Sequence, residues 1–413
     1  MKSTAGRLSV GVALIIAIGF VQPVFADYAA GMAAFKAKDY AKAVQEFKAV
    51  IESQPNEPAT HYMLGLSLRA QGSLSPAVAA LRKAVELDSA SENPNPLYTI
   101  TLGQILNQTK QYGDSYSTLK AVNFPTLPGN YRTTYALLFA QAATESNHAG
   151  EAVNVLNAQV KADSSNADLY QALGVAQNDL GDDKAAFSAF KRAYDLNNKN
   201  TTAGRYAVRS ATEVAKRSSQ TDKIRYYTEA AKLSESLAKS DPSLDNNLLA
   251  GESWMGAKQY STALTWFNKA SAQASQNALV RFYIGQCYTK LNQNEKALAA
   301  LQQALTLGSN NPDLRKKIYD QMGYVYEAKR DFAKAKQAYL EAGYSSKAAA
   351  MDAKAEAQQG NLAHEKDCKD FKLKIDALAL QAQEFEKLGD MESARQMREQ
   401  LTVLQRQYSE TCG

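Results

Sequence analysis

The sequence is poor in residues that turn or cross-link a chain, with 10 Pro, 22 Gly and 3 Cys among 413 residues. An all-β chain needs many turns, so scarce Pro and Gly argue against that class. Three cysteines cannot form a disulfide-dense scaffold. Alanine, in contrast, is abundant at 69 residues, and it loses the least entropy on entering a helix. The composition therefore favours an all-α fold.

Charge of one sign is also lacking, because 47 Lys and Arg face 42 Asp and Glu, for a net charge of +5 with no basic block. Nucleic acid is therefore not expected as a partner. The three histidines, His61, His148 and His364, lie in separate parts of the chain. No phosphate loop, nucleophile elbow or dinucleotide fingerprint occurs. We therefore expect no enzymatic activity, no catalytic residue, no cofactor and no metal site.

The first 26 residues have the three-part pattern of a secretory signal peptide. Lys2 and Arg7 form a short basic region, residues 8–21 are apolar and uncharged, and small residues precede position 27. The apolar run is shorter than the roughly 20 residues of a membrane-spanning helix. We expect cleavage after Ala26, export, most simply to a bacterial periplasm, and a mature chain that is not integral to the membrane.

A repeat of about 34 residues runs through the rest of the chain. A small residue recurs after an apolar one, at Gly31, Gly65, Gly103, Ala140, Gly174, Gly251, Gly285 and Gly323. Twelve positions later comes a second small residue, such as Ala77 or Ala186, and four positions after that a large apolar one, such as Leu81 or Phe190. This spacing predicts two amphipathic helices per unit, whose small residues let the backbones approach closely. Neither helix can bury its apolar face alone, so the units must stack.

The pattern resembles the tetratricopeptide repeat family. The closest stretches are Leu64-Gly65 with Ala77 and Leu81, Leu173-Gly174 with Ala186 and Phe190, and Ile284-Gly285 with Ala297 and Leu301. The resemblance implies an all-α, right-handed solenoid of stacked helical hairpins over residues 27–345, in about nine repeats, with a concave groove that binds other proteins or peptides. The unit at 201–243 is longer than the consensus, which leaves open whether its second helix, near 223–239, protrudes.

Residues 346–413 depart from the repeat and predict a C-terminal helical cap. Apolar seams that include Phe371 and Ile375 before the Gly389 turn, and Leu401 and Tyr408 after it, predict a hairpin that packs on the last repeat. Cys368 and Cys412 come level in such a hairpin, which makes a disulfide plausible in an oxidising compartment. Two free thiols, or a metal site of His364 with Cys368, are the alternatives. Cys287 is expected to be a small buried apolar residue.

The family's inner groove suggests where a partner binds. Side chains near the small residue of each first helix tend to face that groove, and at the N-terminal end they are largely apolar. We expect these residues to receive a hydrophobic peptide or an amphipathic helix; the alternative is that they simply pack or self-associate. They are Tyr28, Met32, Phe35, Tyr62, Met63, Leu66 and Arg69.

The sequence therefore predicts an exported scaffold or adaptor for partner proteins, in envelope assembly or export. A polysaccharide-binding solenoid in an exopolysaccharide or cell-wall system is the alternative, because 22 Tyr could supply stacking surfaces. The oligomeric state is left open.

Overall fold

The computed structural model describes residues 27–412, and the predicted signal peptide, residues 1–26, lies outside them. Throughout the described residues the regular secondary structure is helical, with one short 3₁₀ turn. The chain divides into two compact units between Ser210 and Ala211. No helix in the described part of the chain is both long enough and apolar enough to cross a bilayer.

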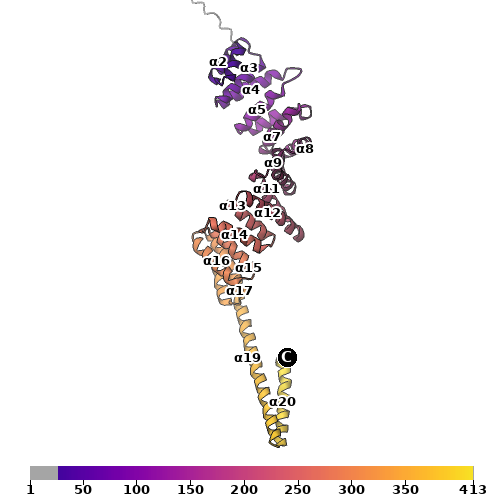
Figure 1. The fold of residues 1–413 in the computed structure, drawn as a ribbon, viewed down its shortest axis with the longest axis vertical. Coiled ribbons are helices and arrows are strands. Elements are labelled where there is room, and N and C mark those ends of the chain that lie inside the picture. The colour runs from indigo at the N-terminus through magenta and orange to yellow at the C-terminus, as the bar shows by residue number, and fades with distance from the viewer. Residues whose placement is uncertain (1–26, 413) are drawn as a thin grey trace, which may run out of the picture. The chain divides into compact units, whose positions relative to one another are not determined.

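The N-terminal unit is a series of antiparallel helix pairs, in which each helix contacts the next along the chain (Figure 1). Its helices are α1 (Tyr28–Lys36), α2 (Tyr40–Ser53), α3 (Pro58–Ala70), α4 (Leu74–Asp88), α5 (Pro96–Gln108), α6 (Tyr112–Lys120), the 3₁₀ turn η1 (Phe124–Thr126), α7 (Gly129–Glu145), α8 (Ala149–Ala162), α9 (Ala167–Asp179) and α10 (Asp183–Leu196). The first helices of successive pairs also touch, as α5 and α7 do.

The boundary between the units falls within α11 (Thr201–Arg217). The C-terminal unit continues with α12 (Gln220–Ser240), α13 (Leu244–Gly256), α14 (Tyr260–Gln273), α15 (Ala278–Lys290), α16 (Asn294–Leu307), α17 (Pro312–Ala328), α18 (Phe332–Glu341), α19 (Ser345–Lys387) and α20 (Met391–Cys412). The prediction of an all-α solenoid of helical hairpins is confirmed.

The small residues of the repeat lie where two helices of a hairpin come closest. A Cβ atom built on Gly174 would lie 2.7 Å from a ring carbon of Phe190, and one on Gly65 would lie 2.6 Å from Leu81. Both large side chains are completely buried. The contact explains the spacing seen in the sequence, because the large residue fills the surface that the missing Cβ leaves free.

The same period places the turn between the two helices. Seven positions after the small residue, the backbone adopts a positive φ: 61° at Lys38, 81° at Gly72, 60° at Lys110, 64° at Asn147 and 75° at Gly181. A left-handed residue ends an α-helix and frees the chain to reverse. Each of these repeats therefore ends its first helix at a fixed position, whether or not the residue at that position is Gly.

Helix α12, which the sequence left open as a protruding helix, is packed instead. It lies against α13 and buries an apolar face that includes Tyr226, Leu233 and Leu237. Its greater length adds turns to a packed helix and does not lift it from the stack.

The C-terminal residues form an arm rather than a cap over the last repeat. Near its start, α19 packs on α18 through Ala348 and Met351, and Lys347 forms an ion pair with Asp320. Helix α20 then folds back along the far part of α19 (Figure 1). It ends level with Cys368, about 35 Å along α19 from Ser345 at 1.5 Å per residue. The expected hairpin exists, but it packs on itself, because α19 continues without a break where a shorter helix was expected.

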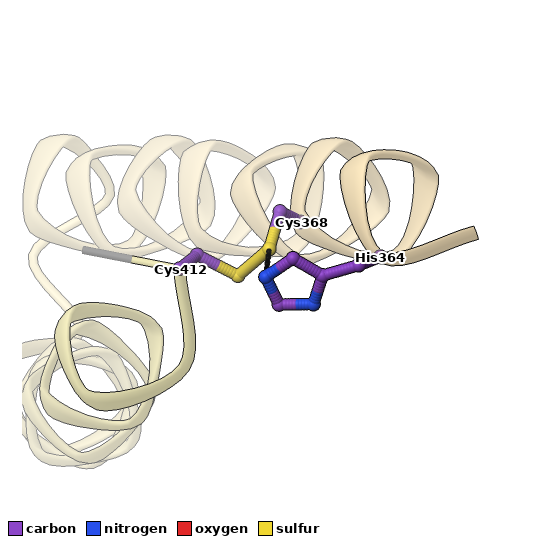
Figure 2. Close-up of a disulfide and its surroundings, with 3 residues drawn as sticks. All are labelled: His364, Cys368 and Cys412. Carbon is purple, nitrogen blue, oxygen red and sulfur yellow. Dashed lines mark hydrogen bonds between the residues drawn. A yellow bond between two sulfur atoms is a disulfide. The ribbon is translucent and has the colours of Figure 1, made fainter. Parts of the chain in front are cut away.

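Cys368 and Cys412 form a disulfide, with their Cα atoms 5.7 Å apart (Figure 2). The bond joins the end of α20 to the middle of α19, at the end of the hairpin opposite the Gly389 turn. Beside it, Nε2 of His364 lies 3.7 Å from the Cys368 sulfur. A disulfide sulfur has no thiolate to offer a metal, so the alternative metal site of His364 and Cys368 is wrong in this structure.

Candidate partner-binding surfaces of the N-terminal unit

The seven side chains proposed for partner binding lie together on α1 and α3, but they are not equally open. Tyr28 is 37% exposed, and its ring packs on Phe47 with centroids 5.6 Å apart. Burial raises the pKa of the Tyr28 hydroxyl above its ordinary value, and the nearby Glu57 acts in the same direction. The hydroxyl therefore remains a hydrogen-bond donor at neutral pH. Phe35 is half-buried and meets Tyr40 edge-on at 5.6 Å.

Met63 does not belong to an open surface. Its side chain is only 8% exposed and lies in the apolar core with Phe47, Leu81 and Ile105. The reason is that α3 packs against both α2 and α4, so a side chain two positions before Gly65 lies between neighbouring helices. The expectation that Met63 faces a partner is therefore wrong, and the packing alternative holds at this position.

Tyr62 and Arg69 connect α3 to α5. The Tyr62 ring lies 4.6 Å from that of Tyr98, and its hydroxyl is 3.3 Å from Oγ1 of Thr101. Arg69 donates a 2.9 Å hydrogen bond through Nη1 to Oε1 of Gln104. Both residues therefore fix the spacing of two first helices. The guanidinium has five N–H donors, and Arg69 remains half-exposed.

Four apolar side chains of the set remain half-buried: Met32, Phe35, Tyr62 and Leu66. Each packs with one side on the core of the first three repeats, and the other side is accessible. The surface formed by these four residues with Tyr28 and Arg69 is called the α1–α3 surface below. Five of its six side chains are apolar or aromatic, and the sixth, Arg69, is a cation.

A hollow of about 880 Å³ lies elsewhere in this unit, and the sequence did not predict it. Its walls come from α4, the 89–95 segment, the start of α5, the end of α6 and η1, with Val85, Thr99 and Thr118 among the lining residues. The hollow exists because α6 has only nine residues, so it ends before it can cover the neighbouring helices. The feature of the sequence that could have indicated the hollow is the irregular spacing of the third repeat.

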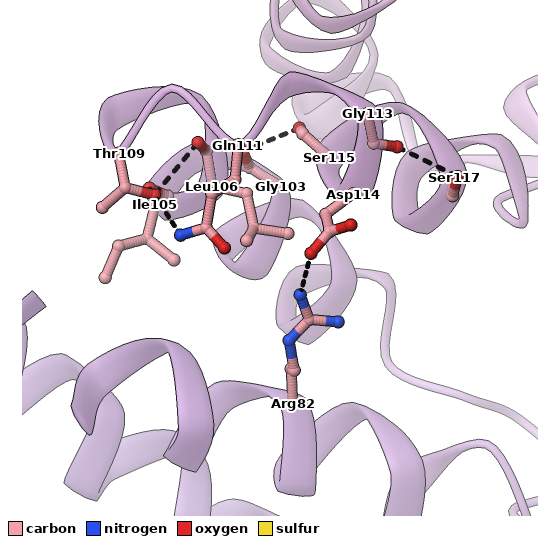
Figure 3. A network of polar contacts seen from close by, with 10 residues as sticks. All are labelled: Arg82, Gly103, Ile105, Leu106, Thr109, Gln111, Gly113, Asp114, Ser115 and Ser117. Atoms are coloured by element: carbon pink, nitrogen blue, oxygen red, sulfur yellow. Dashed lines mark hydrogen bonds and ion pairs between the residues drawn. The ribbon is translucent and has the colours of Figure 1, made fainter. Parts of the chain in front are cut away.

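Polar contacts join α4, α5 and α6 near Arg82 (Figure 3), which is one of the residues that line the hollow. Arg82 of α4 forms an ion pair with Asp114 of α6. Oγ of Ser115 donates to the Gly103 carbonyl at 3.0 Å and ties α6 to α5. Serine occupies here the small-residue position that Ala fills in other repeats, so it keeps the close approach and adds a hydrogen bond.

The remaining candidate residues have structural surroundings. His61 is 9% exposed, and its Nε2 lies 2.8 Å from the Pro55 carbonyl, as expected for a packed histidine. Cys287 is completely buried and free, and burial raises the pKa of its thiol to about 12, which suits an unreactive core residue. Within residues 27–412 no group of three or more His, Cys, Asp or Glu side chains is placed to hold a metal ion. The polysaccharide alternative stays a prediction that no observation tests.

Comparison with known families supports the repeat assignment in several parts of the chain. The tetratricopeptide repeat family matches residues 28–94, and a second match to the same repeat covers residues 167–200 and 317–342. Residues 223–304 match the family described as anaphase-promoting complex, cyclosome, subunit 3. A comparison with curated proteins finds no match.

Solved structures also resemble parts of this chain. A MamA protein from Desulfovibrio magneticus RS-1 is 14% identical, with a TM-score of 0.35, over 44% of this chain and 97% of its own. YrrB, a protein of the same repeat class described as having an unusual peptide-binding site, is 17% identical, with a TM-score of 0.34, over 45% of this chain and 90% of its own. Superpositions this loose carry no argument about ligands. The helix pairs with their recurring close contacts, taken with the family matches, show that this chain belongs to the tetratricopeptide repeat family.

Proposed function

We propose that this protein-interaction scaffold is exported and holds an apolar segment of a partner protein against its α1–α3 surface. Tetratricopeptide repeat proteins bind other proteins or peptides, which gives the class of ligand. Export is inferred from the signal-peptide pattern of residues 1–26. A role in envelope assembly or export follows from that compartment.

The observation that carries the proposed site is the cluster of half-buried apolar side chains on two first helices. Met32, Phe35 and Leu66 already rest on a packed core on one side, so they are held in place before a partner arrives. Ordered side chains lose little further entropy on binding. Grouped apolar surface on a soluble protein commonly marks an interaction site.

The surface also indicates what kind of segment fits. Two apolar side chains of a helix or an extended segment can cover Phe35 and Leu66. A carboxylate beside them can accept from the Arg69 donors that Gln104 does not use. The proposed ligand is therefore a short apolar segment with an acidic residue at one end.

Site-specific photo-crosslinking in the native host tests the proposed site. A photoreactive residue at Leu66 is expected to give covalent adducts, and the same residue at Lys48, which is exposed on α2, should give few. Phe35→Asp, placed in the Leu66 cross-linking chain, should reduce the adducts at least about 10-fold, because it puts a charge into an apolar contact. Equal yields at Leu66 and Lys48, or adducts that Phe35→Asp leaves unchanged in a folded chain, would contradict the proposal.

Export has a separate test. Mass spectrometry of the protein purified from its host should find Asp27 as the first residue, and fractionation should place the chain outside the cytoplasm. Replacing Ala26 by Leu, which is too large for the position before the cleavage site, should leave an uncleaved precursor. A cytoplasmic chain that still begins at Met1 would overturn the export proposal without affecting the cross-linking result.

A further inference from the structure

The hairpin of α19 and α20 buries little of its apolar surface. Ala382 and Ala394 are its buried seam residues, whereas the larger seam side chains Phe371, Ile375 and Leu378 remain half-exposed. Rings of Phe371 and Tyr408 meet edge-on at 6.0 Å, so the two seams do face each other. Two helices can cover each other on one side only, and a core this small needs a staple, which the Cys368–Cys412 disulfide supplies.

A second apolar stripe lies on α19 away from that seam. Leu373 and Leu380 are seven residues apart, hence on one face of the helix, and they are 66% and 58% exposed. Ala377 is exposed between them, so only a methyl group projects from the middle of the stripe. Two leucines on the same face of a helix are typical of a face that packs against another helix, and charged or polar residues are typical of a face in contact with water.

The charges beside this stripe have a two-fold pattern. Lys369 lies four residues before Leu373, and Glu384 lies four residues after Leu380, so both occupy the face of the leucines. When the helix is reversed, the order Lys, Leu, Leu, Glu becomes Glu, Leu, Leu, Lys, so each charge faces an opposite charge and each leucine faces a leucine. An antiparallel second copy centred near Ala377 places Leu373 against Leu380 and Lys369 against Glu384, twice each.

We propose that two copies of this chain associate through antiparallel pairing of the α19 stripe from Lys369 to Glu384. A two-fold interface must be self-complementary, and this stripe is self-complementary in both its leucines and its charges. Lys369 now pairs with Glu365 of its own helix at 2.9 Å. That exposed pair is worth little, so Lys369 can exchange it for Glu384 of the second copy. The same register brings Lys366 near Lys387 at the rim, where salt screens the repulsion.

Light scattering and sedimentation of the full mature chain test this pairing. The chain is expected to have twice the mass of one copy. The double variant Leu373→Glu, Leu380→Glu should associate at least about 100-fold more weakly, because four leucines per dimer lose their contacts. Val403→Glu is the matched control, since Val403 is 57% exposed but lies on α20, away from the stripe. A monomeric parent chain, or a dimer that survives the leucine variant, would overturn the proposal.

Charge reversal tests the register itself. Lys369→Glu and Glu384→Lys should each weaken the dimer, and the two changes combined should restore it, because the opposite charges then face each other again. Ala377→Cys, close to the two-fold axis, should give a covalent dimer under mild oxidation, and Gln407→Cys on α20 should not. If the combined reversal is as weak as either single change, the antiparallel register is wrong. If the stripe instead captures an unrelated protein while the chain stays monomeric, self-association is refuted.

Discussion

The close contact between Gly103 and Leu119 makes the repeat packing directly testable. A Cβ atom at Gly103 would lie 2.6 Å from both Cγ and Cδ2 of Leu119, closer than carbon atoms can pack. Leu119 is completely buried, so its side chain has nowhere to move. Gly103→Ala therefore overpacks the hairpin of α5 and α6, which costs about 1–3 kcal/mol. The gain in helix propensity from Gly to Ala offsets about 1 kcal/mol of that cost.

The expected result is a net loss of up to about 2 kcal/mol in the free energy of unfolding. Gly150→Ala is the matched control in the same unit, because Gly150 lies in the first turn of α8 and a Cβ there meets nothing within 4 Å. That change should be neutral or stabilise by up to about 1 kcal/mol. Urea unfolding followed by circular dichroism measures both, with the midpoint compared at constant slope.

A second variant checks the mechanism. Leu119→Ala alone should cost about 2–5 kcal/mol by creating a cavity beside Gly103. In the double variant the methyl group that Gly103→Ala adds occupies part of that cavity, so the two losses should not add. If Gly103→Ala is as stable as Gly150→Ala, or if the double variant shows simple additivity, the close contact does not explain the 34-residue spacing and the reasoning fails.

Three further outcomes are expected. Met63→Asp should unfold the N-terminal unit, whereas Leu66→Asp should lower the thermal midpoint much less, because Met63 is buried in the core and Leu66 is half-exposed. Equal losses in a thermal melt would show that packing does not distinguish the two positions. A hydrogen bond from Lys354 holds the pKa of Glu327 below its ordinary value. The stability that this pair adds is complete above the ordinary pKa and is lost as the pH falls through the lower pKa of the folded state. Glu327→Gln should therefore flatten the acid-side loss of stability in thermal melts below about pH 5, and an unchanged pH profile would contradict this role of Glu327. Cys412→Ser should release α20, because opening a loop with a sequence separation of 44 removes about 4 kcal/mol of stabilisation. Hydrogen exchange should then rise in α20 but not in α17. Equal protection of α20 with and without the disulfide would contradict a stapling role.

The repeat, its helix pairs and its turns could be predicted from the sequence because they depend on local spacing. Gly65 and Leu81 meet wherever two helices of this length are joined by a short turn. Exposure of the candidate site could not be predicted so well. Met63 and Leu66 are both apolar and three residues apart, yet Met63 is buried in the core and Leu66 is half-exposed. The difference arises from the helices packed around α3, because its main contacts are with α2 of the preceding repeat and α4 of its own.

The C-terminal residues show the same division. Apolar seams before and after Gly389 were enough to predict a hairpin, and the level positions of Cys368 and Cys412 made their disulfide plausible. Where the hairpin lies was decided by tertiary structure. Helix α19 continues for 43 residues, so the hairpin packs on itself and leaves its leucine stripe exposed. Sequence alone determined the helices and their repeat, because those depend on neighbours along the chain. Tertiary structure decided which apolar faces stay open, because exposure depends on every element that packs around them.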